Sequence, residues 1–486
     1  MTDFIKSFQQ FCDLQNRRQF ITQAGIGLGA AAISSLAQSA SATASATTPA
    51  GHHHPPKAKR VIFLFMAGAP SQLDLFDYKP GLEKLHGQPL PKEISKGQRV
   101  TAMTRGKKQV ICASAFKFSK QGQSGLDMCE LLPHLSTVAD DLCLIKSTHT
   151  DAINHDPAKT FFCTGAETPG RPSMGAWLSY GLGSMNKDLP EFIVLTSAFW
   201  SGKVNVQALY SRLWGTGFLP SKHQGIAFQS VGDPVLFLSN PAGVGRKARS
   251  KMLELVARIN RKQQQLTGDP EIQTSIAQQE MAFRMQTSVP ELTDLRNESK
   301  STLEMYGPEV QKVGSFARNC LLARRMAESD VRFIQLFHRG WDHHSNLPTH
   351  MRGQARDVDQ PIAGLLKDLK QRGLLDDTLV VFAGEFGRTA FAQGNPKPNN
   401  YGRDHHPRCF TTWMAGGGIK GGVTHGETDD FGYNIVKDGV HIRDLNATIL
   451  NRLGIDSQRF TVKHRGLDER LTGVQEEARP IRELFV

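Results

Sequence analysis

Short apolar runs that end in clusters of acidic and histidine residues limit the fold classes that this chain can adopt. Residues 331–337 (VRFIQLF) precede the cluster 339–344 (RGWDHH), and residues 378–383 (TLVVFA) precede 384–389 (GEFGRT). A third cluster, 402–407 (GRDHHP), follows soon afterwards. Continuous apolar runs of this length are typical of strands buried on both faces of a parallel sheet. Sites in α/β proteins form at the carboxyl ends of such strands, so these clusters are expected to meet at one sheet edge.

Strand and helix patterns alternate along most of the chain. Further apolar runs predict strands at 61–66, 142–145 and 410–415, and helical patterns lie at 157–165, from 173 onward, at 358–369 and at 443–453. This alternation predicts an α/β fold with a mostly parallel sheet. Residues 245–330 differ, because they hold long helical patterns rich in Gln, Arg, Lys and Glu. They are expected to form a helical insertion over the sheet, and one helix carries apolar residues at helical spacing: Met252, Leu253, Leu255, Val256 and Ile259.

The N-terminal residues 1–46 have the three parts of an export signal. Arg17–Arg18 precede an apolar run at 24–33, and the small residues 40–46 offer cleavage sites. The arginine pair is typical of the Tat route, so the Tat translocase is an expected partner and the periplasm or the exterior the expected location. A frayed N-terminal helix is the alternative. The apolar run is shorter than the roughly 20 residues of a transmembrane helix, and none is expected in the mature chain.

Residues 47–58 are expected to be a linker and residues 59–486 the folded domain. With 39% hydrophobic and 21% charged residues, the chain can bury a large core. Its net charge of +12 favours anionic partners. No nucleic-acid-binding motif is present, so an anionic small molecule or envelope polymer is preferred as substrate, with solubility as the alternative role of the charge. Six of the seven cysteines lie beyond the signal and form no C-x-x-C pair, which leaves disulfides and buried free thiols both open.

Acids and imidazoles from four distant segments predict a metal site. Asp342 and His344 are two positions apart, so in an extended stretch their side chains point to the same side. The last ligand is expected from His405 or His406, in a loop. Oxygen and nitrogen donors together suit Zn²⁺, Mn²⁺ or Fe²⁺ better than Ca²⁺, with Zn²⁺ preferred and Mn²⁺ or Ca²⁺ as alternatives. For each of these residues, the alternative to a metal ligand is an ordinary polar side chain, on the surface or hydrogen-bonded in the core. The predicted ligands are Asp74, Asp342, His344, Glu385 and His405.

Three further residues are predicted to take part in catalysis. Arg388 has the fork geometry that binds phosphate or sulfate oxyanions, with a salt bridge as the alternative. His155 lies at the start of an expected helix, where anions bind. The Thr150 hydroxyl is a nucleophile that a metal or base would activate. Ser173 is a competing hydroxyl, although capping a helix is its preferred role.

Taken together, these motifs resemble one bacterial family. They are 62–68 (IFLFMAG) with Ser71 and Asp74, 340–346 (GWDHHSN), 384–389, 402–405 and 415–422 (AGGGIKGG), and the resemblance runs from about residue 60 to Thr472. The family is Tat-exported, sulfatase-like and of unknown function, within the alkaline phosphatase superfamily. The resemblance implies an alkaline-phosphatase-like central sheet with helices on both faces. It also implies a two-metal site that hydrolyses phosphate, phosphonate or sulfate esters with a Ser, Thr or formylglycine nucleophile.

The resemblance also assigns positions. It implies that Asp74 is the first-strand ligand, Asp342 and His344 the middle pair, and His405 the last histidine ligand. Glu385 stands where the superfamily has the Asp of an Asp-His-Gly turn, and Thr150 lies nearest the nucleophile region.

Two departures from the superfamily pattern affect the expected function. Phe386 replaces the His of the Asp-His-Gly turn and binds no metal, so one of the two metal sites is altered or absent. The sulfatase signature C-x-P-x-R is missing, since Thr164 and Gly165 follow Cys163. The nucleophile stays open among Thr150, Ser173 and a metal-bound water. A metal-dependent hydrolase is therefore the first hypothesis, a non-catalytic binding or assembly protein the second, and a nucleic-acid binder the weakest.

Overall fold

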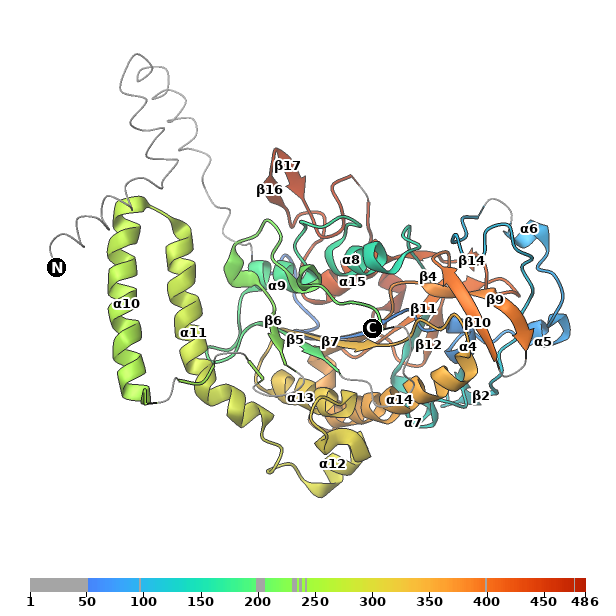
Figure 1. The fold of residues 1–486 in the computed structure, drawn as a ribbon, viewed down its shortest axis with the longest axis horizontal. Helices are drawn as coiled ribbons and strands as arrows, with labels where there is room; N and C mark the ends of the chain where they lie inside the picture. The colour runs from blue at the N-terminus through green and yellow to red at the C-terminus, as the bar shows by residue number, and fades with distance from the viewer. Residues whose placement is uncertain are drawn as a thin grey trace, which may run out of the picture. The chain divides into compact units, whose positions relative to one another are not determined.

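A nine-stranded sheet forms the centre of the fold (Figure 1). Its order is β12-β4-β11-β8-β1-β7-β5-β6, and β15 also pairs with β4. All of these pairings are parallel except those of β11, which runs antiparallel to β4 and β8. The strands are β1 (Arg60–Ala67), β4 (Cys143–His149), β5 (Phe192–Thr196), β6 (Ile226–Phe228), β7 (Phe333–Arg339), β8 (Thr378–Ala383), β11 (Phe410–Ala415), β12 (Val423–His425) and β15 (Val440–His441).

The computed structural model describes residues 51–95, 98–197, 206–229, 234–235, 238–240, 243–397, 400–475 and 477–486. The predicted signal peptide lies outside these residues. Residues 51–58, part of the predicted linker, lie against the end of α15 (Ile442–Arg452), where the backbone N–H groups of Lys57 and Ala58 both donate to the Arg452 carbonyl at 2.8 Å. In the described part of the chain, no helix is both long and apolar enough to cross a membrane.

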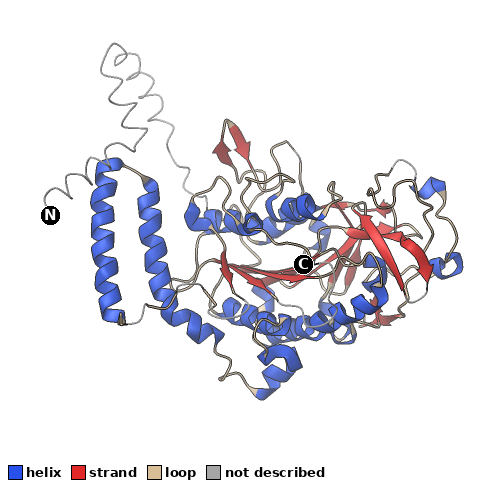
Figure 2. Cartoon of the chain, in the orientation of Figure 1, coloured by secondary structure: helices blue, strands red, loops and turns tan. Residues whose placement is uncertain are grey.

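Helices cover both faces of the sheet because the strands are apolar on both sides (Figure 2). In β1, Val61, Phe63 and Phe65 pack into one core, and the alternate residues 62, 64 and 66 pack into another. The first core is covered by α8 (His155–Thr164), α9 (Met174–Leu182) and α15, and the second by α7 (Pro133–Ser136), α13 (Phe316–Glu328) and α14 (Leu347–Gln371). The predicted α/β class with a mostly parallel sheet is confirmed.

The remaining elements extend from this core. The expected helical insertion begins with a helical hairpin, α10 (Arg246–Thr267) and α11 (Pro270–Thr293), followed by α12 (Lys300–Tyr306). Short helices α4 (Gln72–Leu75), α5 (Gly81–Leu85) and α6 (Lys92–Ser95) follow β1. Four hairpins complete the strands: β2 (Phe118–Gln121) with β3 (Leu126–Cys129), β9 (Gly387–Lys397) with β10 (Asn400–His406), β13 (Glu427–Thr428) with β14 (Ile435–Lys437), and β16 (Val462–His464) with β17 (Leu467–Glu469). The 3-10 turns are η1 (Ala139–Asp141), η2 (Ser211–Trp214), η3 (Ser221–His223), η4 (Pro308–Gln311), η5 (Leu375–Asp377) and η6 (Arg482–Leu484).

Some local expectations were confirmed and others were wrong. The six cysteines beyond the signal are free and buried, which is one of the two alternatives. Ser173 caps α9, since its hydroxyl accepts from the Ala176 N–H. The third polar cluster is not in a loop, because residues 402–406 form most of β10. The helix expected at 358–369 begins earlier, at Leu347, and contains Pro361.

Candidate metal centre

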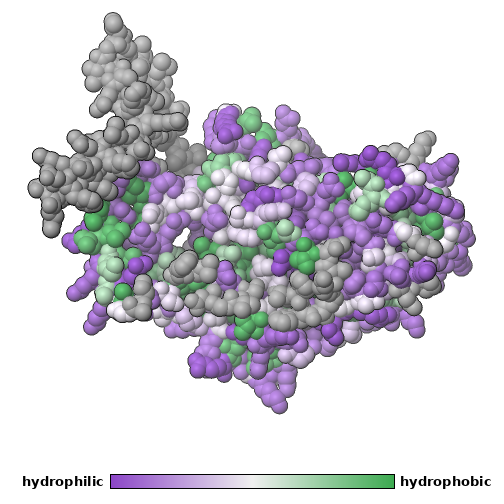
Figure 3. Space-filling view, in the orientation of Figure 1, coloured by the Kyte–Doolittle hydropathy of each residue, from purple (hydrophilic) through white to green (hydrophobic). Residues whose placement is uncertain are grey.

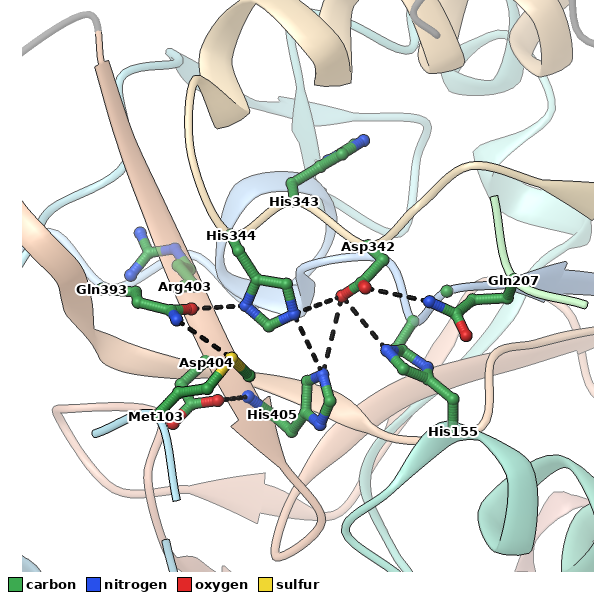
Figure 4. Close-up of polar contacts among 12 residues, drawn as sticks. Met103, His155, Gln207, Asp342, His343, His344, Gln393, Arg403, Asp404 and His405 are labelled. Carbon is green, nitrogen blue, oxygen red and sulfur yellow. Dashed lines mark hydrogen bonds and ion pairs between the residues drawn. The ribbon is translucent and has the colours of Figure 1, made fainter. Parts of the chain in front are cut away.

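Four side chains from three separate parts of the chain meet near one edge of the sheet (Figure 4). His155 begins α8, Asp342 and His344 lie in the loop after β7, and His405 lies in β10. One potential ligand atom of each residue lies within 4.8 Å of all the others. The side chains of His155 and His344 are 10% and 17% exposed, so the cluster reaches solvent. Three imidazoles and a carboxylate at this separation form a donor set for a divalent metal ion.

Each imidazole is held through its Nδ1 atom by an acceptor. The Nδ1 of His155 lies 2.6 Å from Glu385 Oε1, and that of His405 lies 2.8 Å from the Ile153 carbonyl oxygen. The Nδ1 of His344 contacts the amide oxygen of Gln393. A carboxylate, a carbonyl and an amide oxygen cannot donate, so each Nδ1 carries a proton and each Nε2 faces the cluster, where its lone pair would bind an ion. This orientation by outer partners is characteristic of metal-binding histidines.

The three Nε2 atoms converge on one oxygen of Asp342. Its Oδ1 lies 2.7 Å from His344, 3.1 Å from His155 and 3.5 Å from His405. The other oxygen, Oδ2, accepts from Gln207 Nε2 at 2.9 Å. Burial by itself would raise the pKa of Asp342. The Arg388 guanidinium and the imidazoles outweigh burial and hold this pKa well below its usual range, so the carboxylate is charged at neutral pH.

Two neighbouring histidines beside Asp342, His155 and His405, titrate differently. Burial lowers the pKa of His155, but the hydrogen bonds to Asp342 and Glu385 outweigh burial, and the net shift is upward. Burial also dominates at His405 and lowers its pKa to about 4, despite the contact with Asp342. Of these two histidines, His155 is therefore the one that holds a proton more strongly in the absence of an ion, between two carboxylates. Metal binding would displace that proton.

His343 points away from the cluster, whereas its neighbours on both sides point into it (Figure 4). Its Nε2 lies 2.9 Å from the Gly340 carbonyl oxygen, and burial lowers its pKa to about 3. Asp342 and His344 thus share a side, as their spacing predicts. Of the two candidates for the last histidine, His405 joins the cluster, and His406 lies 2.8 Å from the Tyr433 carbonyl oxygen.

Glu385, a predicted ligand, lies behind His155 and is fully buried. Its Oε1 accepts from His155 Nδ1 and also from the backbone N–H of Gly68 at 2.9 Å. Gly68 has a φ of +112°, and a Cβ there would lie 2.6 Å from the backbone nitrogen of Asp342. Glycine therefore lets the end of β1 approach both the carboxylate and the metal loop. In this arrangement Glu385 orients a histidine, and it is not among the four converging residues.

Asp74, the other predicted ligand from β1, is also outside the four. It is fully buried in α4 and lies 2.7 Å from Arg403 Nε. It also accepts from the hydroxyls of Ser71 at 2.5 Å and Tyr401 at 2.8 Å. Burial raises the pKa of Asp74, but Arg403 outweighs burial and the net shift is downward. The carboxylate is therefore neutralised by a guanidinium in the structure.

The predicted catalytic residues have three different surroundings. His155 belongs to the metal cluster itself. Arg388 is buried and donates to Asp342 Oδ1 at 2.8 Å and to the Ala69 carbonyl at 2.9 Å, so its fork holds protein groups. The hydroxyl of Thr150 is buried and has no hydrogen-bond partner among the described residues, and its backbone N–H donates to Pro407.

Phe386 closes one side of the centre with an apolar ring. It is buried, and its centroid lies 4.9 Å from that of His155 and 4.6 Å from that of His405. The ring packs against two of the converging imidazoles and offers no ligand. The outer partners Gln207, Gln393 and Ile153 had no sequence signal, because amides and backbone carbonyls occur throughout any chain.

Comparison with known proteins gives the family. The model of a family described as a protein of unknown function, DUF1501, matches residues 58–485. The chain belongs to this family. No curated protein matches it.

Solved structures with related shapes include three hydrolases of low identity. A phosphonate monoester hydrolase from Silicibacter pomeroyi is 12% identical over 88% of this chain and 76% of that one, with a TM-score of 0.35. The sulfatase PsFucS1 from Pseudoalteromonas sp. gives the same four values. The alkaline phosphatase of the Antarctic bacterium TAB5 is 11% identical over 82% of this chain and 98% of that one, with a TM-score of 0.31. These TM-scores are low, so the fold is described from its own strand order.

Proposed function

We propose that this protein is an exported, metal-dependent hydrolase of phosphate or sulfate esters. The convergence of three imidazole Nε2 atoms on Asp342, with every Nδ1 atom held by an acceptor, carries this proposal. His155, Asp342, His344 and His405 would hold the ion. Zn²⁺ is preferred for three imidazoles and one carboxylate, with Mn²⁺ or Ca²⁺ as alternatives. A bound ion would polarise an ester oxygen and lower the pKa of a water molecule.

The residues around the four ligands support the chemistry by fixing their orientation and charge. Glu385 holds the His155 ring, and Gln207 and Arg388 hold the two oxygens of Asp342. Preorganised ligands do not need to be reordered when the ion binds, which favours affinity. The basic chain attracts anionic substrates, such as a small ester or an envelope polymer.

Export by the Tat translocase to the periplasm or the exterior is part of the proposal. The arginine pair and the apolar run of residues 1–46 support it. The Tat route carries folded proteins and therefore suits a chain that acquires its ion before export.

A non-catalytic binding or assembly protein is the second candidate. The converging set contains no hydroxyl, and Phe386 occupies one side of it. Four protein ligands also complete the tetrahedral shell of a structural zinc site, whereas a catalytic zinc keeps a position open. A metal without turnover is the result that this candidate predicts.

Metal content and ester hydrolysis, measured on the same preparations, test both candidates. The wild type, the variant Asp342→Ala/His344→Ala and the control His350→Ala are purified without chelator or His tag. His350 is a half-buried histidine outside the four. We expect metal and turnover of phosphate or sulfate esters in the wild type and the control, and neither in the double variant. Metal without turnover supports the second candidate, and absence of metal after incubation with Zn²⁺, Mn²⁺ and Ca²⁺ refutes the metal-dependent hydrolase and leaves a binding protein without an ion.

A further inference from the structure

The helix α10 carries an unusual combination of exposed apolar and basic side chains. Its 22 residues include seven Lys or Arg and a single acidic residue, Glu254. Five large apolar side chains are exposed: Met252 by 50%, Leu255 by 50%, Val256 by 38%, Ile259 by 57% and Leu266 by 77%. Figure 3 shows green apolar side chains among purple ones along this helix. Exposed apolar side chains that gather in one patch mark a site of contact with a protein or a membrane.

The exposed apolar residues lie on one face of α10. Positions 252, 255, 256 and 259 follow the i, i+3, i+4, i+7 spacing that places side chains on one side of a helix. Ala257, the only buried residue of α10, lies on a different side, and α10 packs against α11. Lys251, Arg258 and Lys262 lie along one border of the apolar face. The helix therefore has one face toward α11 and a second, apolar face bordered by cations.

The hairpin is fixed to the body of the protein through α11. The Glu271 carboxylate at its start accepts from Ser221 at 2.8 Å, and further along Arg284 and Ser288 donate to the carbonyls of Lys187 at 2.6 Å and Asp188 at 2.7 Å. The inner helix thus supplies the attachment, and the outer helix presents its apolar face.

We propose that the apolar face of α10 docks on the surface of a membrane containing anionic phospholipid. Interfacial helices have this pattern: an apolar face enters the headgroup region while Lys and Arg beside it bind lipid phosphates. The many charges of α10 prevent it from crossing the bilayer, in agreement with the absence of a spanning helix among the described residues. Docking would hold an exported enzyme beside substrates in the envelope.

Charge and hydrophobicity distinguish this partner from two others. A nucleic acid would pair with the cations but would leave Leu255 and Ile259 in water. A second copy of the chain would bring two α10 helices together, each with seven basic residues and one acidic residue, and these would repel. An anionic lipid surface satisfies both the apolar face and its cationic border.

Vesicle cosedimentation of the full chain tests the proposal. Phosphatidylcholine vesicles are compared with vesicles that also contain phosphatidylglycerol, and we expect binding to the anionic vesicles that weakens as salt is added. The variant Leu255→Gln/Ile259→Gln should weaken this binding at least about tenfold, because two large apolar contacts are lost. The control Val436→Gln/Leu467→Gln changes two exposed apolar residues in other elements and should bind like the wild type.

A second variant tests the cationic border. Lys251→Glu/Arg258→Glu/Lys262→Glu should abolish the preference for anionic vesicles while circular dichroism shows unchanged helix content. Vesicle binding that is equal in the wild type and both α10 variants overturns the proposal. Two other results also overturn the proposal. One is that the protein binds DNA and the apolar variant binds it equally well. The other is that the apolar variant loses self-association but still binds vesicles. The metal-free variant Asp342→Ala/His344→Ala should bind vesicles normally, which separates this inference from the proposed hydrolase.

Discussion

The substitution Glu385→Gln tests whether the Glu385 carboxylate orients His155 or binds the metal ion itself. In the structure, Glu385 Oε1 accepts from His155 Nδ1 at 2.6 Å and from Gly68 N at 2.9 Å. Glutamine retains an oxygen and the size of the side chain but removes the negative charge. Loss of such an outer partner weakens metal binding by about 10–100-fold, or about 1.4–2.7 kcal/mol.

A change in the pKa of His155 is expected to keep the loss of metal affinity near the lower end of that range. Asp342 and Glu385 together raise the pKa of His155, against the effect of burial. Removing one carboxylate lowers this pKa, so fewer protons compete with the ion at neutral pH. We therefore expect Glu385→Gln to bind Zn²⁺ about tenfold more weakly than the wild type, with unchanged stoichiometry.

Competition with a chromophoric zinc chelator measures the affinity, and mass spectrometry of the native protein measures the stoichiometry. Glu477→Gln serves as the control, because that carboxylate is 80% exposed and pairs only with Arg479 among described residues. If Glu385→Gln loses the ion as completely as Asp342→Ala, Glu385 is itself a ligand. If its affinity equals that of the wild type, the His155–Glu385 contact does not orient the ring. Either result refutes the reasoning.

Three further perturbations address stability and packing. Arg403→Met should destabilise the protein by about 3–5 kcal/mol in urea denaturation, because it leaves the buried carboxylate of Asp74 unpaired; a change below about 1 kcal/mol would contradict this. A Cβ on Gly402 would lie 1.9 Å from the carbonyl carbon of His344, so Gly402→Ala should weaken zinc binding, and unchanged affinity would show that β10 shifts freely. Burial lowers the pKa of His223 to about 4 in the folded protein. As pH falls below about 6.5, His223 is therefore protonated in the unfolded chain before it is protonated in the folded protein. Stability should therefore decline from about pH 6.5 to pH 4, and His223→Asn should reduce the decline in denaturation curves; an equal slope in both proteins would oppose it.

Five strands of the sheet, β1, β4, β7, β8 and β11, could be predicted because their burial on both faces leaves a continuous apolar run, whereas β5, β6, β12 and β15 were not predicted. An apolar run does not depend on the direction in which the strand runs through the sheet. It therefore did not show that β11 (residues 410–415) runs antiparallel to both neighbours. The hairpin strand β10 lacked the signal altogether, since its sequence NYGRDHH is polar. Its buried polar residues are paired with other polar groups, among them Arg403 with Asp74. Such pairing is a tertiary property and leaves no periodic pattern in the sequence.

Three of the four converging residues, Asp342, His344 and His405, were among the predicted ligands, but a shared direction could be predicted only for the two that are close in sequence. Asp342 and His344 lie two positions apart, and their common side follows from local geometry. The sequence indicated a functional role for His155 but not its place beside them, because that depends on how α8 packs against the end of β8. Whether a carboxylate such as Asp74 meets an ion or a guanidinium depends on the course of α4 and β10. Residue type alone gives no answer there.

The buried Arg403 bears on how many ions the centre holds. It lies 2.7 Å from Asp74, the predicted ligand in α4, so this carboxylate already has a cationic partner. Each unit of charge on a second ion about 4 Å from a guanidinium would be repelled by about 4 kcal/mol at the effective dielectric constant of a protein. Phe386 offers no ligand to offset this repulsion. One ion per chain is therefore expected from native mass spectrometry, and a second ion lost on Asp74→Asn would show that Arg403 moves aside.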